Sequence, residues 1–165
     1  MSDQAPSTKP FELFDHIQAV GYVSLIWSNL DVRMNNAIWE LADLSPTTGA
    51  CLTSQLPGTG QRVQCLMALL KHRNAPKSLI DGFNSLAGAI DAAGRKRSKL
   101  VQHELEIFRS VNVDLRIGFE FEAMPTGDFS VELTGWHELA ATITNLIKRF
   151  DGIFSRVDAR LRSPS

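Results

Sequence analysis

The sequence predicts a mostly α-helical domain, an antiparallel bundle of four to five helices with a β-hairpin inserted before the last long helix. Three observations predict this fold class. Apolar residues recur at alternating steps of three and four over most of the chain, as in amphipathic helices. Between residues 113 and 133 the apolar period changes to two, which is typical of strands. The composition, 44% hydrophobic and 21% charged residues, is that of a globular domain.

The chain has 165 residues, which is the size of one domain, and we expect residues 1–10 to be a disordered tail before a single domain over 11–165. The formal net charge of -1 argues against a general electrostatic nucleic-acid binder. Two cysteines, Cys51 and Cys65, make neither a disulfide framework nor a zinc site. Because neither a signal core nor a long apolar run is present, we expect a soluble cytoplasmic protein without membrane contact, metal or cofactor.

The first predicted helix covers residues 11–44 and is apolar on two sides. Its main apolar face consists of Val20, Val23, Trp27, Leu30, Met34, Ile38 and Leu41. A second stripe, spaced by sevens, consists of Leu25, Val32 and Trp39. A helix with two apolar sides has two packing partners. One partner is the domain core. The other is either the hairpin or a second subunit, and the second reading predicts a homodimer.

Three shorter helices are predicted in the middle of the chain, over residues 46–55, 61–73 and 78–93. Ser45 is the expected N-cap of the first of them, and Pro46 is its first residue. Gly94 is expected to stop or kink the third, because glycine commonly follows the end of a helix. A new helix then begins at Arg95.

Strict alternation predicts the two strands of the hairpin, over residues 113–122 and 129–134. A hairpin alone is marginally stable in water, so its apolar face is expected to pack on helices. The last predicted helix runs from Trp136 to about Leu161 and carries a long apolar stripe.

The stretch from Arg95 to His103 concentrates the side chains that carry chemistry. If a helix begins there, its free backbone N–H groups favour an anion. Arginine binds phosphate with two hydrogen bonds, and histidine acts as a general acid or base near neutral pH. The pair therefore suffices for metal-independent RNA cleavage. Arg97 and His103 are the candidate catalytic residues, and the candidate substrate-binding residues are Arg95, Lys96, Ser98 and Lys99.

The segment "RSKLVQH" resembles the signature of the HEPN superfamily. In that signature an arginine and a polar residue, followed after a short spacer by a histidine, lie at the start of a late helix of a small helical bundle. Here they are Arg97, Ser98 and His103. The commonest family form has asparagine where Ser98 stands and a shorter spacing, which would place Gln102 at the histidine position. The resemblance implies a homodimer with a composite cleft and, in many members, a metal-independent endoribonuclease of the toxin or defence type.

Helix geometry keeps a second reading open. On one straight helix Arg97 and His103 point about 120° apart, with Arg97 heading the core stripe. Arg97 would then form a partly buried ion pair with a carboxylate, the choices being Asp31, Asp91 and Glu104. Three functions follow: a dimeric module that engages RNA, with or without cleavage; a non-catalytic protein-interaction or regulatory module, antitoxin-like or a scaffold; and a small-ligand sensor between bundle and hairpin.

Overall fold

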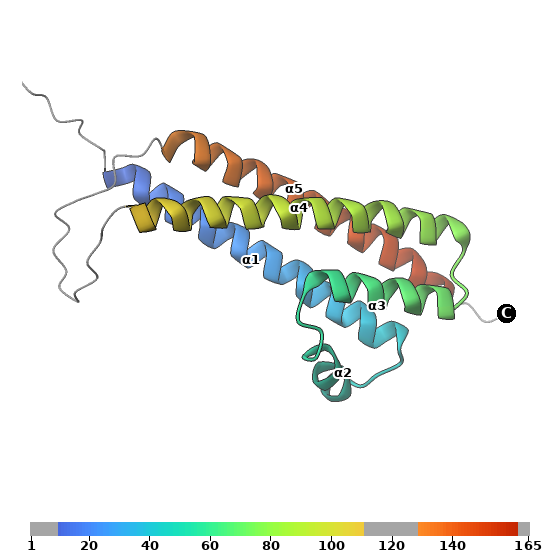
Figure 1. Ribbon diagram of the computed structural model, residues 1–165. Helices are drawn as coiled ribbons and strands as arrows, with labels where there is room; N and C mark the ends of the chain where they lie inside the picture. Colours follow the sequence, from blue (N-terminus) through green and yellow to red (C-terminus); the bar gives the residue numbers. More distant parts are fainter. Residues whose placement is uncertain (1–9, 111–128, 162–165) are drawn as a thin grey trace, which may run out of the picture.

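The computed structural model of the protein describes residues 10–110 and 129–161, with side chains over 15–103 and 133–157. Every element in this part of the chain is an α-helix, which confirms the all-α bundle (Figure 1). The five helices are α1 (Pro10–Leu41), α2 (Pro46–Thr53), α3 (Thr59–His72), α4 (Lys77–Ser110) and α5 (Phe129–Leu161).

The three long helices α1, α4 and α5 lie side by side, and the shorter α3 covers part of their length (Figure 1). Helix α5 packs against both α1 and α4, and α3 also packs against both of them. The four helices therefore stand at the corners of a bundle in which α1 and α4 face each other diagonally. Helix α2 packs on α1, outside this group.

Helices α1 and α3 run in the same direction. The Thr59 hydroxyl donates to Asp31, and one turn further along both helices Arg62 donates to Asn35. The two helices are parallel because residues 42–58, which include α2, lead the chain back along α1. Helix α3 therefore begins beside the middle of α1 and not beside its end.

Helix α5 is antiparallel to α4. Lys96 contacts Glu138, and Ser85, earlier on α4, contacts Arg149, later on α5. In consequence α1, α3 and α5 all run one way and α4 alone runs the other (Figure 1). Helix α4 is therefore antiparallel to α3 and α5, the two helices on which it packs.

Helix α4 is continuous through Gly94, so the predicted break is wrong. A glycine inside a helix costs about 1 kcal/mol relative to alanine. Here the missing side chain makes room for the indole of Trp27, which reaches α4 from α1, because a Cβ added at Gly94 would lie 3.3 Å from Cη2 of Trp27. Close packing by the indole explains why glycine occupies this position without ending the helix.

The predicted hairpin is not supported by the described residues. The first strand, residues 113–122, lies outside them, as does the ligand cavity expected beside it. The second strand, residues 129–134, is wrong, because these residues form the first turns of α5. The apolar spacing of three and four from Leu133 through Trp136 to Ala140 continues the helical stripe to the N-terminal side of Trp136. The expected tail, residues 1–10, also lies outside the description except for Pro10.

The core lies along the axis of the four-helix group and confirms the main apolar face of α1. Val23, Leu30 and Met34 are completely buried, and Val20 is half-buried. Other completely or almost completely buried side chains come from α3, α4 and α5: Leu66, Leu70, Phe83, Leu86, Ile90, Trp136, Leu139 and Ile143. None of the described helices combines the length and the apolar character needed to cross a membrane.

The second stripe of α1 has two different environments. Trp39 is half-buried under α2, where its indole N–H donates to the Thr53 hydroxyl at 3.2 Å. Leu25 and Val32 remain exposed, with 68% and 54% of their surfaces accessible. Helix α2 is therefore a partner of this stripe that the sequence did not predict, and it covers only one end of it.

Candidate binding groove

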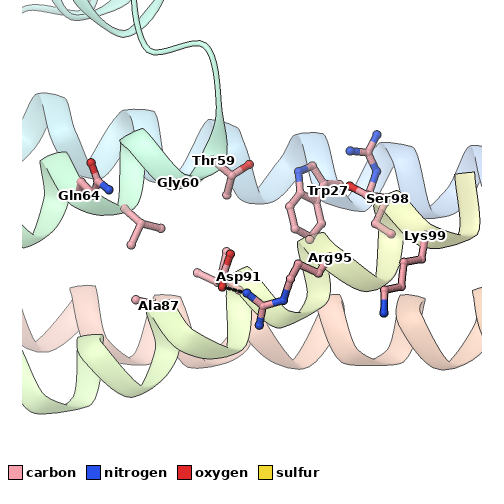
Figure 2. A pocket seen from close by; sticks show the side chains of 13 residues that line it. Trp27, Thr59, Gly60, Gln64, Ala87, Asp91, Arg95, Ser98 and Lys99 are labelled. Carbon is pink, nitrogen blue, oxygen red and sulfur yellow. Dashed lines mark hydrogen bonds and ion pairs between the residues drawn. The ribbon is translucent and has the colours of Figure 1, made fainter. Parts of the chain in front are cut away.

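A groove of about 690 Å³ lies at the N-terminal end of α3, beyond which α3 does not cover the space between α1 and α4 (Figure 2). Its α1 and α3 sides are lined by Trp27, Thr59, Gly60, Val63 and Gln64. Its α4 side is lined by Ala87, Ile90, Asp91, Gly94, Arg95, Arg97, Ser98 and Lys99. Volumes of roughly 300–1,000 Å³ are typical of small-ligand sites, so the groove has room for a ligand. We call it the α1–α3–α4 groove.

Polar contacts between α1 and α3 fix the edge of this groove. The Thr59 hydroxyl donates to Oδ1 of Asp31 at 3.0 Å, and Nε of Arg62 donates to Oδ1 of Asn35 at 2.8 Å. The Arg62 guanidinium also lies 3.7 Å from the Asp31 carboxylate, and both side chains are largely covered. Partly buried, charge-assisted contacts hold geometry better than exposed ones, so the first turn of α3 has a defined position.

The floor of the groove is formed by Trp27 and the α4 backbone at Gly94. The indole is almost completely covered, since only 7% of the residue surface is accessible. Cζ of Arg97 lies 5.6 Å from the centroid of the Trp27 ring, the distance of a cation–π contact. Because the guanidinium is attracted to the ring face, Trp27 orients Arg97 before any ligand binds.

Charge is distributed unevenly along the α4 side of the groove. Arg95 forms an ion pair with Asp91, one turn before it on the same helix. Arg97 and Lys99 have no carboxylate partner among the described residues, and the Ser98 hydroxyl lies between them in sequence. The groove therefore carries unbalanced positive charge although the whole chain has a net charge of -1.

The opposite end of the groove is largely apolar. Val63, Ala87 and Ile90 line it, and the Gln64 amide is the polar group there. Figure 2 shows Gln64 at one end and Lys99 at the other, with Asp91 and Arg95 between them. A ligand that fits this groove has an anionic head and an uncharged body.

Four of the six residues singled out in the sequence line the groove: Arg95, Arg97, Ser98 and Lys99. Lys96 points to α5 instead, where its Nζ lies 2.8 Å from Oε2 of Glu138. This hydrogen bond and the ammonium charge lower the pKa of Glu138. His103 is exposed on α4 and is not among the residues that line the groove. The structure thus brings the basic residues together without the histidine.

The expected helix start at Arg95 is wrong. The continuous α4 engages the backbone N–H groups there, so anion binding at that end is not available. Of the three carboxylates expected to pair with Arg97, Asp91 and Asp31 contact Arg95 and Arg62, and the side chain of Glu104 lies outside the described residues. Arg97 lies on an aromatic ring instead.

Sequence reasoning missed Trp27, Thr59 and Gln64 as groove residues. Trp27 was correctly assigned to the core face, and a side chain can belong to the core and still line a cavity. Thr59 lies in "LPGTGQ", which reads as a loop, although Thr59 begins α3. The available signal was Gly94, a glycine within a long helical pattern that marks a close approach of another element.

Within the described residues, no three histidine, cysteine, aspartate or glutamate side chains gather to hold a metal ion. The chain matches no protein-family model, no curated protein and no solved structure.

Proposed function

We propose that the protein is a HEPN-like helical module that engages RNA through the α1–α3–α4 groove. One observation carries the proposal: Arg97 and Lys99 reach a single groove without carboxylate partners among the described residues, and Arg97 is oriented there by Trp27. Arginine matches the geometry of phosphate oxygens, and its plane also stacks on unpaired bases. Single-stranded RNA presents both groups.

The binding roles follow from position. Arg97 and Lys99 contact different phosphates, because residues two positions apart on a helix point about 160° apart. The Ser98 hydroxyl, which lies between them in sequence, is a further donor. Arg95 contributes less, because Asp91 already neutralises it. Lys96 takes no part in this binding, since it is bound to Glu138 on the α5 side.

RNA binding is tested by measuring the affinity for a single-stranded RNA over a range of salt concentrations. Removing one cation that binds phosphate makes the slope of log K against log salt shallower by about 0.7 for single strands. We expect this change of slope for Lys99→Ala, together with weaker binding for both Lys99→Ala and Arg97→Ala. Lys77→Ala, an exposed lysine at the start of α4, is the control and should leave slope and affinity unchanged. Equal affinity in all four proteins would refute the proposal.

Cleavage of the RNA is a further step of the same proposal. Histidine takes the 2′-hydroxyl proton while the 2′-oxygen attacks the phosphorus, and arginine stabilises the charge that builds on the phosphate. The bond from phosphorus to the 5′-oxygen breaks, and the departing 5′-oxygen takes a proton from water, which leaves a cyclic phosphate and a 5′-hydroxyl. Arg97 and His103 point about 120° apart on α4, so a shared site needs the histidine of a second copy. The composite cleft implied by the HEPN resemblance has this form.

Cleavage is tested with wild-type protein and RNA in excess chelator, beside His103→Ala and Gln102→Ala. We expect a 2′,3′-cyclic phosphate product that is lost only in His103→Ala. Product from His103→Ala at the wild-type rate would exclude this mechanism. RNA binding without cleavage in any of the proteins would identify a binding module alone.

A second function, protein interaction, is favoured by the exposed apolar residues of α1. Leu25 and Val32 lie two turns apart on one face, and neither is covered by α2. We propose that this face joins two copies of the chain. Light scattering at tens of micromolar, an order-of-magnitude range for weak complexes, should show a dimer for the wild type and a monomer for Leu25→Glu. A monomeric wild type would refute the dimer and would favour a different protein as the partner of this face.

A further inference from the structure

We propose that one side of α1 docks on the same side of a second copy in an antiparallel arrangement, with the two-fold axis beside Leu25. This side, which we call the outer face of α1, consists of the exposed residues Ile17, Gly21, Leu25, Ser28 and Val32. The inference rests on the dimer proposed above and adds the direction and the register of the two helices. It follows from the charge of the outer face, from the sizes of its side chains and from the place of α2.

The outer face lies mostly in a part of α1 that has no acidic side chain, lysine or arginine. Between Asp15 and Asp31 the sequence contains none of these, over a helix length of about 22 Å, although they make up 21% of the chain. Four of the five large apolar side chains that the described residues expose also lie on α1. The centre of a protein–protein interface is depleted of charged residues. A second copy offers a matching uncharged surface, so that docking strips water from no charged group.

All residues of the outer face point the same way. At 100° per residue they fall within an arc of about 80°, opposite the buried Val23 and Leu30. Gly21 has no packing role within the described chain, because a Cβ added there would meet no atom within 4 Å. Glycine inside a helix is destabilising relative to alanine. The close approach of a second helix at Gly21 gives this glycine a role.

The side chains of the outer face fit one another when the second copy runs antiparallel. Ile17 and Val32 lie equally far from a point just before Leu25, one on each side, and so do Gly21 and Ser28. A two-fold axis at that point places Ile17 of each copy on Val32 of the other. Leu25 then enters the space between the partner's Gly21 and Ser28, two small residues seven positions apart, as a knob enters a hole in paired helices.

Helix α2 disfavours the parallel arrangement. It covers Trp39, which continues the outer face towards the C-terminal end of α1. In a parallel pair equal residues face each other, so each α2 would stand between the two copies of α1. In the antiparallel pair α2 lies level with the beginning of the partner's α1, which starts at Pro10. The length from Ile17 to Val32 is then free for the contact.

This dimer keeps the two α1–α3–α4 grooves separate. The outer face points away from the core, and α4 lies across the core from α1. The partner's α4, which carries His103, is therefore behind the partner's own α1 and does not reach Arg97. RNA binding by each groove is compatible with this dimer, whereas cleavage by a composite site would need a different interface.

The direction of the helices is tested with two double variants of the full chain at Gly21 and Ser28, both of which are exposed. Gly21→Lys/Ser28→Glu brings opposite charges together in an antiparallel pair and like charges together in a parallel pair. Gly21→Lys/Ser28→Lys brings like charges together in both. Sedimentation equilibrium at low salt measures the dissociation constant of each dimer, and circular dichroism checks that each variant is helical.

We expect the Lys/Glu variant to dimerise at least as tightly as the wild type. The Lys/Lys variant should dimerise at least about tenfold more weakly, because like charges that face each other across an interface repel. Gly88→Lys/Ala92→Lys is the control, since it adds the same charge at two exposed positions of α4 and should dimerise as the wild type does.

The inference and the proposed dimer fail in different ways. A wild type that stays monomeric at tens of micromolar, an order-of-magnitude range for weak complexes, overturns both. Weakened dimers in both the Lys/Glu and the Lys/Lys variants show a parallel pair, so that the antiparallel arrangement is wrong while the dimer through Leu25 and Val32 stands. A Lys/Lys variant that dimerises as tightly as the wild type overturns both, because the two copies then meet at another surface.

Discussion

Arg97 shows how a single side chain depends on residues from another helix. Its half-buried position is set by Trp27 on α1, and Trp27 reaches this place because Gly94 lacks a side chain. The sequence indicated that Arg97 heads an apolar stripe, and the described part of that stripe, Arg97 and Val101, is half-buried. It did not indicate the partner, because Trp27 is far away in the chain.

The first residue-scale prediction compares two arginines that are two positions apart. Arg97→Ala removes a cation–π contact and the packing of its aliphatic stem, so we expect the free energy of unfolding to fall by about 1–2 kcal/mol. Arg95→Ala removes an exposed ion pair and should cost less than about 0.5 kcal/mol. Urea unfolding of both variants measures the difference. Equal losses would show that the Trp27 contact contributes nothing.

Two glycines of α4 make a second comparison. A Cβ at Gly88 would meet no atom within 4 Å, so Gly88→Ala should stabilise the protein by about 0.5–1 kcal/mol through helix propensity alone. A Cβ at Gly94 would press on Trp27, so Gly94→Ala should raise the free energy of unfolding by less than Gly88→Ala does, or lower it. Thermal unfolding of the two variants gives the answer. If Gly94→Ala stabilises the protein as much as Gly88→Ala does, the Trp27 indole moves aside without an energetic cost.

At the scale of elements, α2 depends on one close contact. Trp39 lies so near Gly49 that an added Cβ would overlap the indole ring. Ser45 caps the helix by accepting from the Thr48 backbone N–H, as the sequence predicted. The sequence did not show that α2 would cover Trp39, because a short helix with little periodicity does not reveal its packing partner.

We therefore predict that Gly49→Ala weakens the docking of α2. The expected loss is about 1–3 kcal/mol, the usual cost of overpacking. Trp39→Leu in the same chain should relieve the clash, so that Gly49→Ala costs less in that background than in the wild type. A double-mutant cycle in urea measures this coupling. Additive losses would mean that Gly49 and Trp39 act independently.

The helices themselves were predictable from apolar periodicity, but two of their boundaries were not. Gly94 would indicate a helix end only if no side chain packed on it. The alternating pattern of residues 129–134 also fits the first turns of a helix whose apolar stripe continues through Leu133 and Trp136. In both cases a contact made in three dimensions outweighs a local preference.

At the scale of the whole molecule, the fold class was predictable and the helix directions were not. The lengths and apolar faces of the helices require a bundle. Whether α3 runs with α1 or against it depends on the path of residues 42–58, and no periodicity describes that path. The groove arises from this arrangement, because the parallel α3 starts halfway along α1 and leaves the cationic part of α4 uncovered.

The whole-molecule prediction concerns the last helix. Helix α5 packs on both α1 and α4 and buries large side chains that include Trp136, Ile143 and Phe150. Each such burial is worth about 1.5–3 kcal/mol, and domains are stable by only about 5–15 kcal/mol. A chain that ends at residue 128 should therefore lose cooperative thermal unfolding and its near-ultraviolet circular dichroism. A sharp melting transition in that chain would show that α1 to α4 fold alone.

The packing of α5 on α1 joins the two ends of the described chain, and this has a consequence on the ribosome. The core face of α1, with Val23, Leu30 and Met34, leaves the exit tunnel long before the helix that covers it has been translated. At about 5–20 residues per second, that face stays accessible for on the order of ten seconds. The nascent chain thus offers general chaperones an amphipathic helix whose apolar side is uncovered, and native structure forms around α1 only after α5 has been translated.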